Sequence, residues 1–213
     1  MINSLLENRF TKKEKKNRAI VWNILIKFFQ KYIDINSTVL DIGSGFGEFI
    51  NNIKAKKKIA LDICDMKKFY KNDVDFFQTD MTDLSFIEDE SIDCVFASNF
   101  FEHINTKIKF QKIFNEISKK IKKNGIIIIM QPDFELSYKH YFKFYDHNII
   151  FTLESMAEVL KFFNFNIELK IKRFMPFSFK QYFPINRLFV IIYMKFYFLR
   201  YFFGKQFLLI GRK

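Results

Sequence analysis

The chain has 213 residues, 49% of them hydrophobic, which suits a single α/β domain and allows a full core. Its formal charge of +12 favours anionic partners such as nucleic acid, phosphorylated sugars or anionic lipid, although a coding bias toward lysine gives the same excess. The two cysteines lack metal-ligand spacing, which fits a reducing compartment better than a disulfide framework. Residues 1–18 lack the apolar run of a signal peptide, so we expect a cytoplasmic protein.

Hydrophobic periodicity predicts strands and helices in alternation along the chain. The predicted strands are short and apolar, and they cover residues 37–43, 57–64, 74–80, 91–98, 124–132, 166–174 and 205–213. The predicted helices repeat apolar residues every three or four positions, over residues 12–33, 47–54, 107–123 and 153–165. This alternation predicts an α/β fold with a seven-stranded, mostly parallel sheet that has helices on both faces.

The last two predicted strands lack the helical crossover that a parallel pair would need, so the last strand is expected to run antiparallel. One domain is expected over residues 1–213. It begins with an N-terminal helical extension (1–36) and continues as a core (38–131). The remainder (132–213) is expected to hold a lid, the last strands and a helical, apolar insertion (174–204) before the final strand.

Three of the six glycines follow the first predicted strand closely, at Gly43, Gly45 and Gly47. Without a Cβ, such a turn lets a nucleotide-type ligand approach backbone N–H groups at the start of the next segment. A dinucleotide-binding G-x-G-x-x-G pattern would need glycine at position 48, which is Glu48. Asp41, two residues before the first glycine, would repel a phosphate but suits a ligand that carries an ammonium group.

The stretch "VLDIGSGFG" and the segments that follow it to residue 131 resemble, in order, the motifs of class I S-adenosylmethionine-dependent methyltransferases. The resemblance implies a Rossmann-like fold whose core (38–131) binds S-adenosyl-L-methionine. It assigns cofactor binding to Asp41, Gly43, Ser44, Gly45, Gly47, Asp62, Ile63, Asp80, Met81 and Asn99. A nicotinamide dehydrogenase is the rival on the same kind of sheet, and the missing third glycine together with Asp41 disfavours it.

The same resemblance implies a role for each acidic residue. Asp41 would face the amino group of the methionine part, and Asp62 would accept hydrogen bonds from both ribose hydroxyls. Asp80 would hold the adenine amino group, with Met81 beside it offering a backbone N–H. Asn99 would meet the cofactor in the loop after the fourth strand.

Methyl transfer from a sulfonium is an in-line displacement, and a hydroxyl acceptor must also lose a proton. Histidine is suited to that step near neutral pH. His103 follows the fourth strand, and Asp146 and His147 follow the fifth, so we predict these three as catalytic residues on the acceptor side of the site. The plainer alternative is that His103 caps the next helix and His147 completes a turn. No metal site is predicted.

The nature of the acceptor is suggested by two further segments. "SNFFEH" after the fourth strand replaces the Asn/Asp-Pro-Pro-Tyr of amino-methylating enzymes, and it resembles small-molecule O-methyltransferases. "YFKFYDHNIIFT", "RFMPFSFK" and "FGKQFLLIGRK" resemble bacterial methyltransferases associated with surface-polysaccharide synthesis. A sugar hydroxyl or another small glycan precursor is the expected acceptor. An RNA methyltransferase, which would use the positive charge, and a non-catalytic protein that binds cofactor or a partner are the alternatives.

Residues 185–203 belong to the most apolar part of the chain. Their longest uninterrupted apolar run, 188–194, is far shorter than the roughly 20 residues that span a bilayer. An interfacial helix at the inner face of the membrane would suit a lipid-linked acceptor. A helix packed over the sheet edge or in a homodimer interface is the alternative that we favour.

Overall fold

The computed structural model describes residues 10–177 and 186–213, so parts of the predicted extension (1–36) and insertion (174–204) lie outside the described residues. One seven-stranded sheet forms the centre, in the order β3-β2-β1-β4-β5-β7-β6. Its strands are β1 (Thr38–Ile42), β2 (Lys57–Asp62), β3 (Asp75–Gln78), β4 (Ile92–Ser98), β5 (Ile121–Pro132), β6 (Asn166–Met175) and β7 (Gln206–Arg212). The pairs among β1 to β5 are parallel, whereas β7 runs antiparallel to both β5 and β6. The predicted fold class is confirmed.

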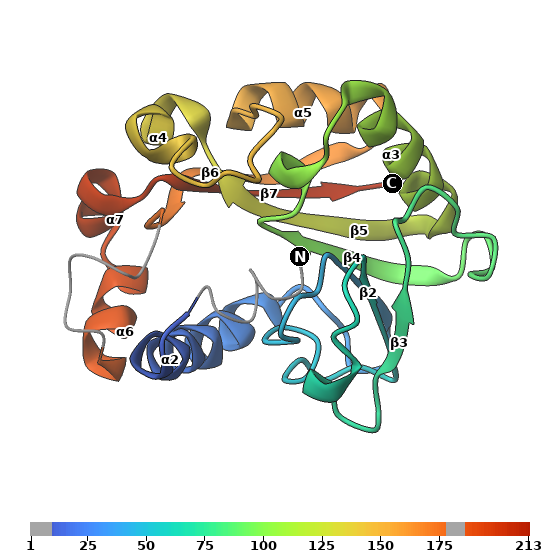
Figure 1. The fold of residues 1–213 in the computed structure, drawn as a ribbon, viewed down its shortest axis with the longest axis horizontal. Helices are drawn as coiled ribbons and strands as arrows, with labels where there is room; N and C mark the ends of the chain where they lie inside the picture. The colour runs from blue at the N-terminus through green and yellow to red at the C-terminus, as the bar shows by residue number, and fades with distance from the viewer. Residues whose placement is uncertain (1–9, 178–185) are drawn as a thin grey trace.

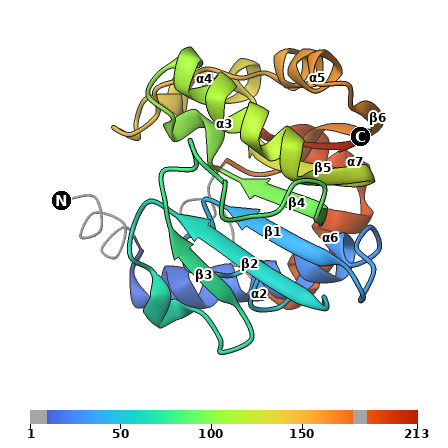
Figure 2. The same ribbon diagram turned by 90° about the vertical axis from the view of Figure 1, so that its right-hand side faces the viewer.

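Helices cover both faces of this sheet (Figures 1 and 2). One face carries α3 (Lys107–Lys120), α4 (Phe134–Tyr141) and α5 (Leu153–Phe162). The other carries α2 (Lys12–Phe29) and α6 (Arg187–Lys195), and α7 (Tyr197–Phe203) packs near the edge strand β6. Two 3₁₀ turns, η1 (Lys67–Phe69) and η2 (Phe101–His103), lie in the connections after β2 and β4.

The core divides into two layers because side chains alternate across each strand. On β5, Ile127 and Ile129 pack toward α3 and α5, while Ile126, Ile128 and Met130 pack toward α2 and α6. Both sets are buried, which explains why this strand is continuously apolar in the sequence.

The predicted helix over residues 47–54 is wrong. This segment forms turns, because Asn52 competes for the backbone groups that a helix would use. Its side-chain amide donates to the carbonyl of Glu48 at 2.9 Å, and its backbone N–H donates to Phe49 O at 3.0 Å. Two backbone bonds of helical spacing remain, from Asn51 to Gly47 and from Ile53 to Phe49, and they do not propagate.

The predicted boundary at 123/124 lies three residues too late. Helix α3 ends at Lys120, and β5 begins at Ile121, which pairs with Ile92 of β4 before the register shifts. Asn124 then takes a left-handed φ of 67°, so the polar residues of this stretch form an irregular start of the strand.

The apolar insertion packs against the fold through its inner face. Val190 and Tyr193 of α6 are buried in the layer shared with α2, and α7 contacts β6. Among the described residues, no helix is both long and apolar enough to cross a membrane.

Replacing Phe96 by alanine should destabilise the fold strongly. Phe96 of β4 is 1% exposed, stacks on Phe49 with ring centroids 3.7 Å apart, and meets Phe29 edge-on at 5.1 Å. The cavity should lower the free energy of unfolding by about 3–5 kcal/mol in urea denaturation. Phe162→Ala, at a position 77% exposed, is the control and should change it by less than about 0.5 kcal/mol. Similar losses in both variants would contradict the assigned core.

Candidate functional site

The predicted cofactor residues lie at or just after the carboxyl ends of the neighbouring strands β1 to β4. The chain leaves β1 toward β2 on one side, and it leaves β4 toward β5 on the other. Ligands of open α/β sheets bind where the strand order diverges in this way. The candidate site therefore centres on the loops that follow β1 and β4.

The glycine turn after β1 has left-handed backbone at Gly43, Gly45 and Gly47, with φ of 63°, 51° and 70°. A Cβ at Gly43 would lie 2.4 Å from the Phe100 ring, and one at Gly47 would lie 2.6 Å from Asn51 Nδ2. A Cβ at Gly45 would meet nothing within 4 Å. Packing thus explains two of the glycines, while Gly45 borders open space that a ligand could use.

Hydrogen bonds to neighbouring segments fix this turn. The N–H and the hydroxyl of Ser44 both donate to Leu61 O at 3.0 Å. The Tyr70 hydroxyl donates to Gly45 O at 2.8 Å and lies 2.7 Å from Ser44 Oγ. Ser44 is thus a structural support of the turn. Tyr70 was not predicted, because nothing in its local sequence signals a contact with residues 25 positions earlier.

Two buried carboxylates lie next to the glycine turn. Asp62 accepts the N–H of Gly45 and that of Cys64, each at 2.9 Å, which leaves lone pairs for further donors. Burial raises the pKa of Asp62, and burial raises the pKa of Asp41 well above its ordinary range, with the charges of Asp62 and Glu48 adding to the effect. Such a site favours a ligand that carries positive charge.

The remaining predicted cofactor residues lie farther along the same edge. Asp80 follows β3, and hydrogen bonds from Thr82 together with Lys109 hold the pKa of its carboxyl below its usual range. Met81 and Asn99 both have left-handed backbone, with φ of 64° and 50°. This conformation costs a non-glycine residue about 1–2 kcal/mol and is concentrated at functional sites. Ile63 is 51% exposed beside Asp62.

The three predicted catalytic residues come together although 43 positions separate the first two. His103 Nδ1 lies 3.0 Å from the backbone oxygen of Asp146 and 3.3 Å from its carboxylate. The rings of His103 and His147 have centroids 5.0 Å apart. A protonated His103 also opposes the burial effect on the pKa of Asp62, so the two halves of the site lie within electrostatic reach.

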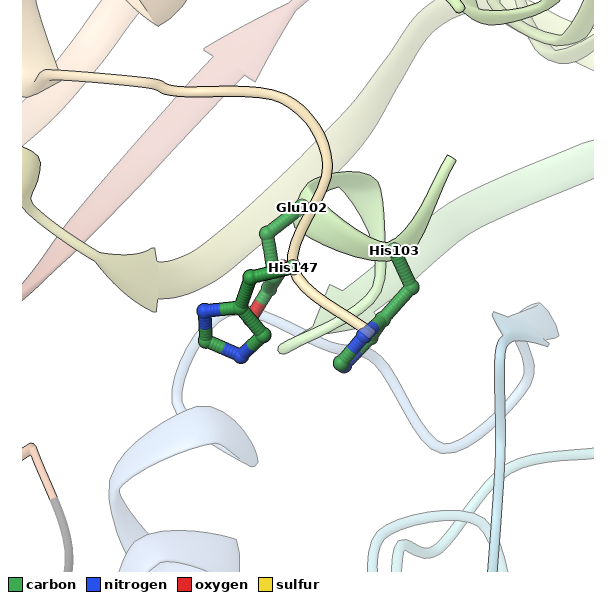
Figure 3. Close-up of side chains that lie close together, drawn as sticks. All are labelled: Glu102, His103 and His147. Atoms are coloured by element: carbon green, nitrogen blue, oxygen red, sulfur yellow. The ribbon is translucent and has the colours of Figure 1, made fainter. Parts of the chain in front are cut away.

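A fourth residue, Glu102, joins this group and was not predicted. Its side chain is 1% exposed, and one ligand-capable atom each of Glu102, His103 and His147 all lie within 4.8 Å of one another. Figure 3 shows the three side chains gathered between η2 and the loop before α5. We call Glu102, His103, Asp146 and His147 the histidine cluster. The sequence placed Glu102 next to a predicted catalytic residue, His103. It could not show that the Glu102 side chain is buried beside His147.

Comparison with known proteins defines the family. Residues 12–170 match the family model of a methyltransferase domain, and the chain belongs to this family. A curated relative, the uncharacterized protein MJ0638 of Methanocaldococcus jannaschii, is 33% identical over 109 residues, which are 51% of this chain and only 45% of that protein.

Solved structures agree on the fold. A SAM dependent methyltransferase from Archaeoglobus fulgidus is 21% identical over 90% of this chain and 94% of that chain, with a TM-score of 0.63. An S-adenosylmethionine dependent methyltransferase from Mesorhizobium loti is 12% identical over 88% and 96%, with a TM-score of 0.63. Identities this low establish the fold, and the reaction must be argued from the site.

Replacing Asp41 by asparagine should stabilise the protein near neutral pH. The folded-state pKa of Asp41 is raised above its ordinary value of 3.8, so the wild type loses stability as the pH rises through the folded value. The variant lacks this loss. Urea unfolding at a series of pH values above 3.8 should show the advantage of the variant growing as the pH rises. A variant that is equally destabilised at every pH would assign the carboxylate a structural role.

Proposed function

We propose that the protein is an S-adenosylmethionine-dependent methyltransferase that methylates a hydroxyl of a sugar or another small-molecule precursor of a cell-surface glycan. The observation that carries this proposal is the pair of buried carboxylates, Asp41 and Asp62, beside a glycine turn that is open at Gly45. S-adenosylmethionine fits this arrangement because it carries a cationic amino group for one carboxylate and two ribose hydroxyls for the other.

The residues along the sheet edge fit the parts of the cofactor. Asp41 would pair with the amino group, and the open side of Gly45 would let the backbone approach closely. Asp62 has carboxylate lone pairs to accept both ribose hydroxyls. Asp80 would accept from the adenine amino group, and Met81 would offer its backbone N–H beside it.

We assign removal of the acceptor proton to the histidine cluster. S-adenosylmethionine supplies a methyl group with a good leaving group already attached. The protein has to align the acceptor oxygen with that methyl group and take up or release the hydroxyl proton. His103 stands directly after β4, and Asp146 and His147 reach it from the segment between α4 and α5. Asp146 orients the His103 ring through Nδ1.

Aromatic side chains around His147 support a sugar as the acceptor. Phe144 stacks on the His147 ring with an interplanar angle of 20° and centroids 5.2 Å apart. Tyr138, Phe142 and Tyr145 are exposed on the same segment, and Tyr145 is 95% exposed. Flat apolar faces beside hydrogen-bonding groups are suited to pyranose rings, which have apolar faces and polar edges.

Transfer of a radiolabelled methyl group tests this proposal. Purified protein, labelled S-adenosylmethionine and an extract of the source cells should place label in lipid-linked glycan or nucleotide-sugar fractions. Gly45→Ala is the inactive control: its Cβ meets no protein atom within 4 Å, so the expected folding loss is only about 1–2 kcal/mol of backbone strain. We expect cofactor binding to weaken at least about tenfold, since the methyl group enters the ligand's space.

Other distributions of label would contradict the proposal. Label in RNA would identify RNA as the acceptor and would give the +12 charge a role in binding it. Cofactor binding without label in any fraction would support the non-catalytic alternative.

The outer faces of α6 and α7 form an aromatic surface. Its large, exposed side chains are Leu188, Ile192, Phe196, Tyr197, Phe198, Tyr201, Phe202 and Phe203. Arg187, Lys195 and Arg200 belong to the same helices, which lie along one edge of the molecule (Figure 1). We propose that this surface contacts the inner face of an anionic membrane, with aromatic rings in the headgroup boundary and cations on the lipid phosphates. The protein would then be cytoplasmic and peripheral, near a lipid-linked acceptor.

Vesicle co-sedimentation checks this contact. The protein should pellet with vesicles that contain phosphatidylglycerol and much less with pure phosphatidylcholine. Phe198→Ser with Phe202→Ser should abolish the difference, whereas Phe162→Ser, an exposed phenylalanine of α5, should not. A wild-type protein that stays in the supernatant would contradict the membrane contact, and a dimer that is lost in the double variant would assign the surface to a homodimer interface.

A further inference from the structure

Glu102, His103 and His147 bring a carboxylate and two imidazoles to one place, with one ligand-capable atom of each within 4.8 Å of the others. We propose that this cluster binds a divalent first-row transition metal ion. No metal site was predicted, because an adjacent pair and a residue 44 positions later match no common metal-binding spacing. The binding itself does not depend on the proposed methyl transfer, whereas its catalytic consequence rests on that function.

The donor set selects the class of ion. Imidazole nitrogen suits zinc, iron, cobalt, nickel and copper, while magnesium and calcium prefer oxygen ligands throughout. Ligand atoms bound to one zinc ion lie about 2.0–2.2 Å from it, and so about 3–4 Å from each other. The three donors of this cluster lie within 4.8 Å of one another, so binding would draw them closer together to reach that spacing.

The hydrogen bond between His103 and the Asp146 carbonyl is of a kind that commonly supports a metal-binding histidine. His103 Nδ1 lies 3.0 Å from the Asp146 carbonyl oxygen, which can only accept, so Nδ1 carries the proton. Nε2 then keeps the lone pair that a metal ion requires. A metal-binding histidine commonly donates its other ring N–H to a carbonyl or carboxylate in this way.

Backbone hydrogen bonds hold the two segments of the cluster together. The carbonyl of Glu102 accepts the N–H of Asn148 at 2.7 Å and that of Ile149 at 3.2 Å. The Asn148 side chain donates to the carbonyls of His103 and Asp146, each at 3.2 Å. The donors are therefore placed by the fold before any ion arrives, which lowers the cost of binding.

Two of the three proposed ligands are buried and the third is part-exposed, as expected for a metal site that a substrate can reach. Glu102 and His147 are buried, whereas His103 is part-exposed. Three protein ligands with one accessible side leave a position for water or substrate, as catalytic metal sites do. An acceptor hydroxyl at that position would have a lowered pKa. With the ion bound, the histidine cluster would promote loss of the acceptor proton through the metal: the proton would pass to water instead of to an imidazole, and the oxygen would form the new C–O bond as the C–S bond of the sulfonium breaks.

Zinc titration of the EDTA-treated full-length chain tests the proposal. Calorimetry should give one Zn²⁺ per chain, and Co²⁺ should give visible absorption from the same site. His147→Ala and Glu102→Gln should each weaken binding by about tenfold or more. The chain's third histidine, His140, lies outside the cluster, so His140→Ala is the matched control and should bind like the wild type. A wild type that takes up no ion, or equal uptake by all four proteins, would overturn the site.

Three further measurements, of thermal unfolding, cofactor binding and methyl transfer, separate a failure of the metal site from a failure of the proposed function. Wild-type-like thermal unfolding and S-adenosylmethionine binding would show that a variant has folded, and Glu102→Gln is the second variant if His147→Ala fails. Methyl transfer by EDTA-treated protein should fall and return with added metal. Bound metal without any transfer would uphold the site and reject the proposed function. Transfer that EDTA does not affect, with no metal bound, would reject the site and uphold the function.

Discussion

The candidate site is organised around two carboxyl groups, those of Asp41 and Asp62, that are buried at the ends of β1 and β2. Asp41 and Asp62 are buried, and burial raises the pKa of both carboxyls. A buried carboxylate costs folding free energy unless donors or a cation compensate it. The N–H groups of Gly45 and Cys64 offset part of this cost at Asp62, and a left-handed glycine turn is what brings the first of them into range. The same turn leaves its open side at Gly45, so the demand for positive charge and the access for a ligand coincide.

The neighbouring strands β1 and β4 connect this half of the site to the histidine cluster. Phe100, just after β4, fills the space that a Cβ at Gly43 would need, so the two loops are packed against each other. Two residues later the chain reaches Glu102 and His103, whose carbonyls also anchor the segment that carries His147. Methyl transfer needs a donor and an acceptor held in line, and under the proposed assignment the loops after one pair of parallel strands would set both positions.

The sheet was predictable because its evidence is local: apolar runs, their spacing and the glycines between them. The antiparallel end followed from the missing crossover. The helix over 47–54 failed because a side chain, Asn52, took the carbonyl that the pattern assigned to the backbone. His103, Asp146 and His147 were predicted from their places after the fourth and fifth predicted strands, and the fold brings them together. Tyr70 and Glu102 were missed because their importance lies in contacts and burial that only the folded chain creates.

Calorimetric titration of the purified chain with S-adenosylmethionine at several pH values would show whether Asp41 and Asp62 form the binding site of a cationic cofactor. We expect one site per chain, with an affinity that rises as the pH rises above the ordinary carboxyl value and Asp41 and Asp62, whose pKa values burial raises, lose their protons to meet the cationic cofactor. Absence of binding at millimolar cofactor, or an affinity that falls as the pH rises, would contradict this assignment.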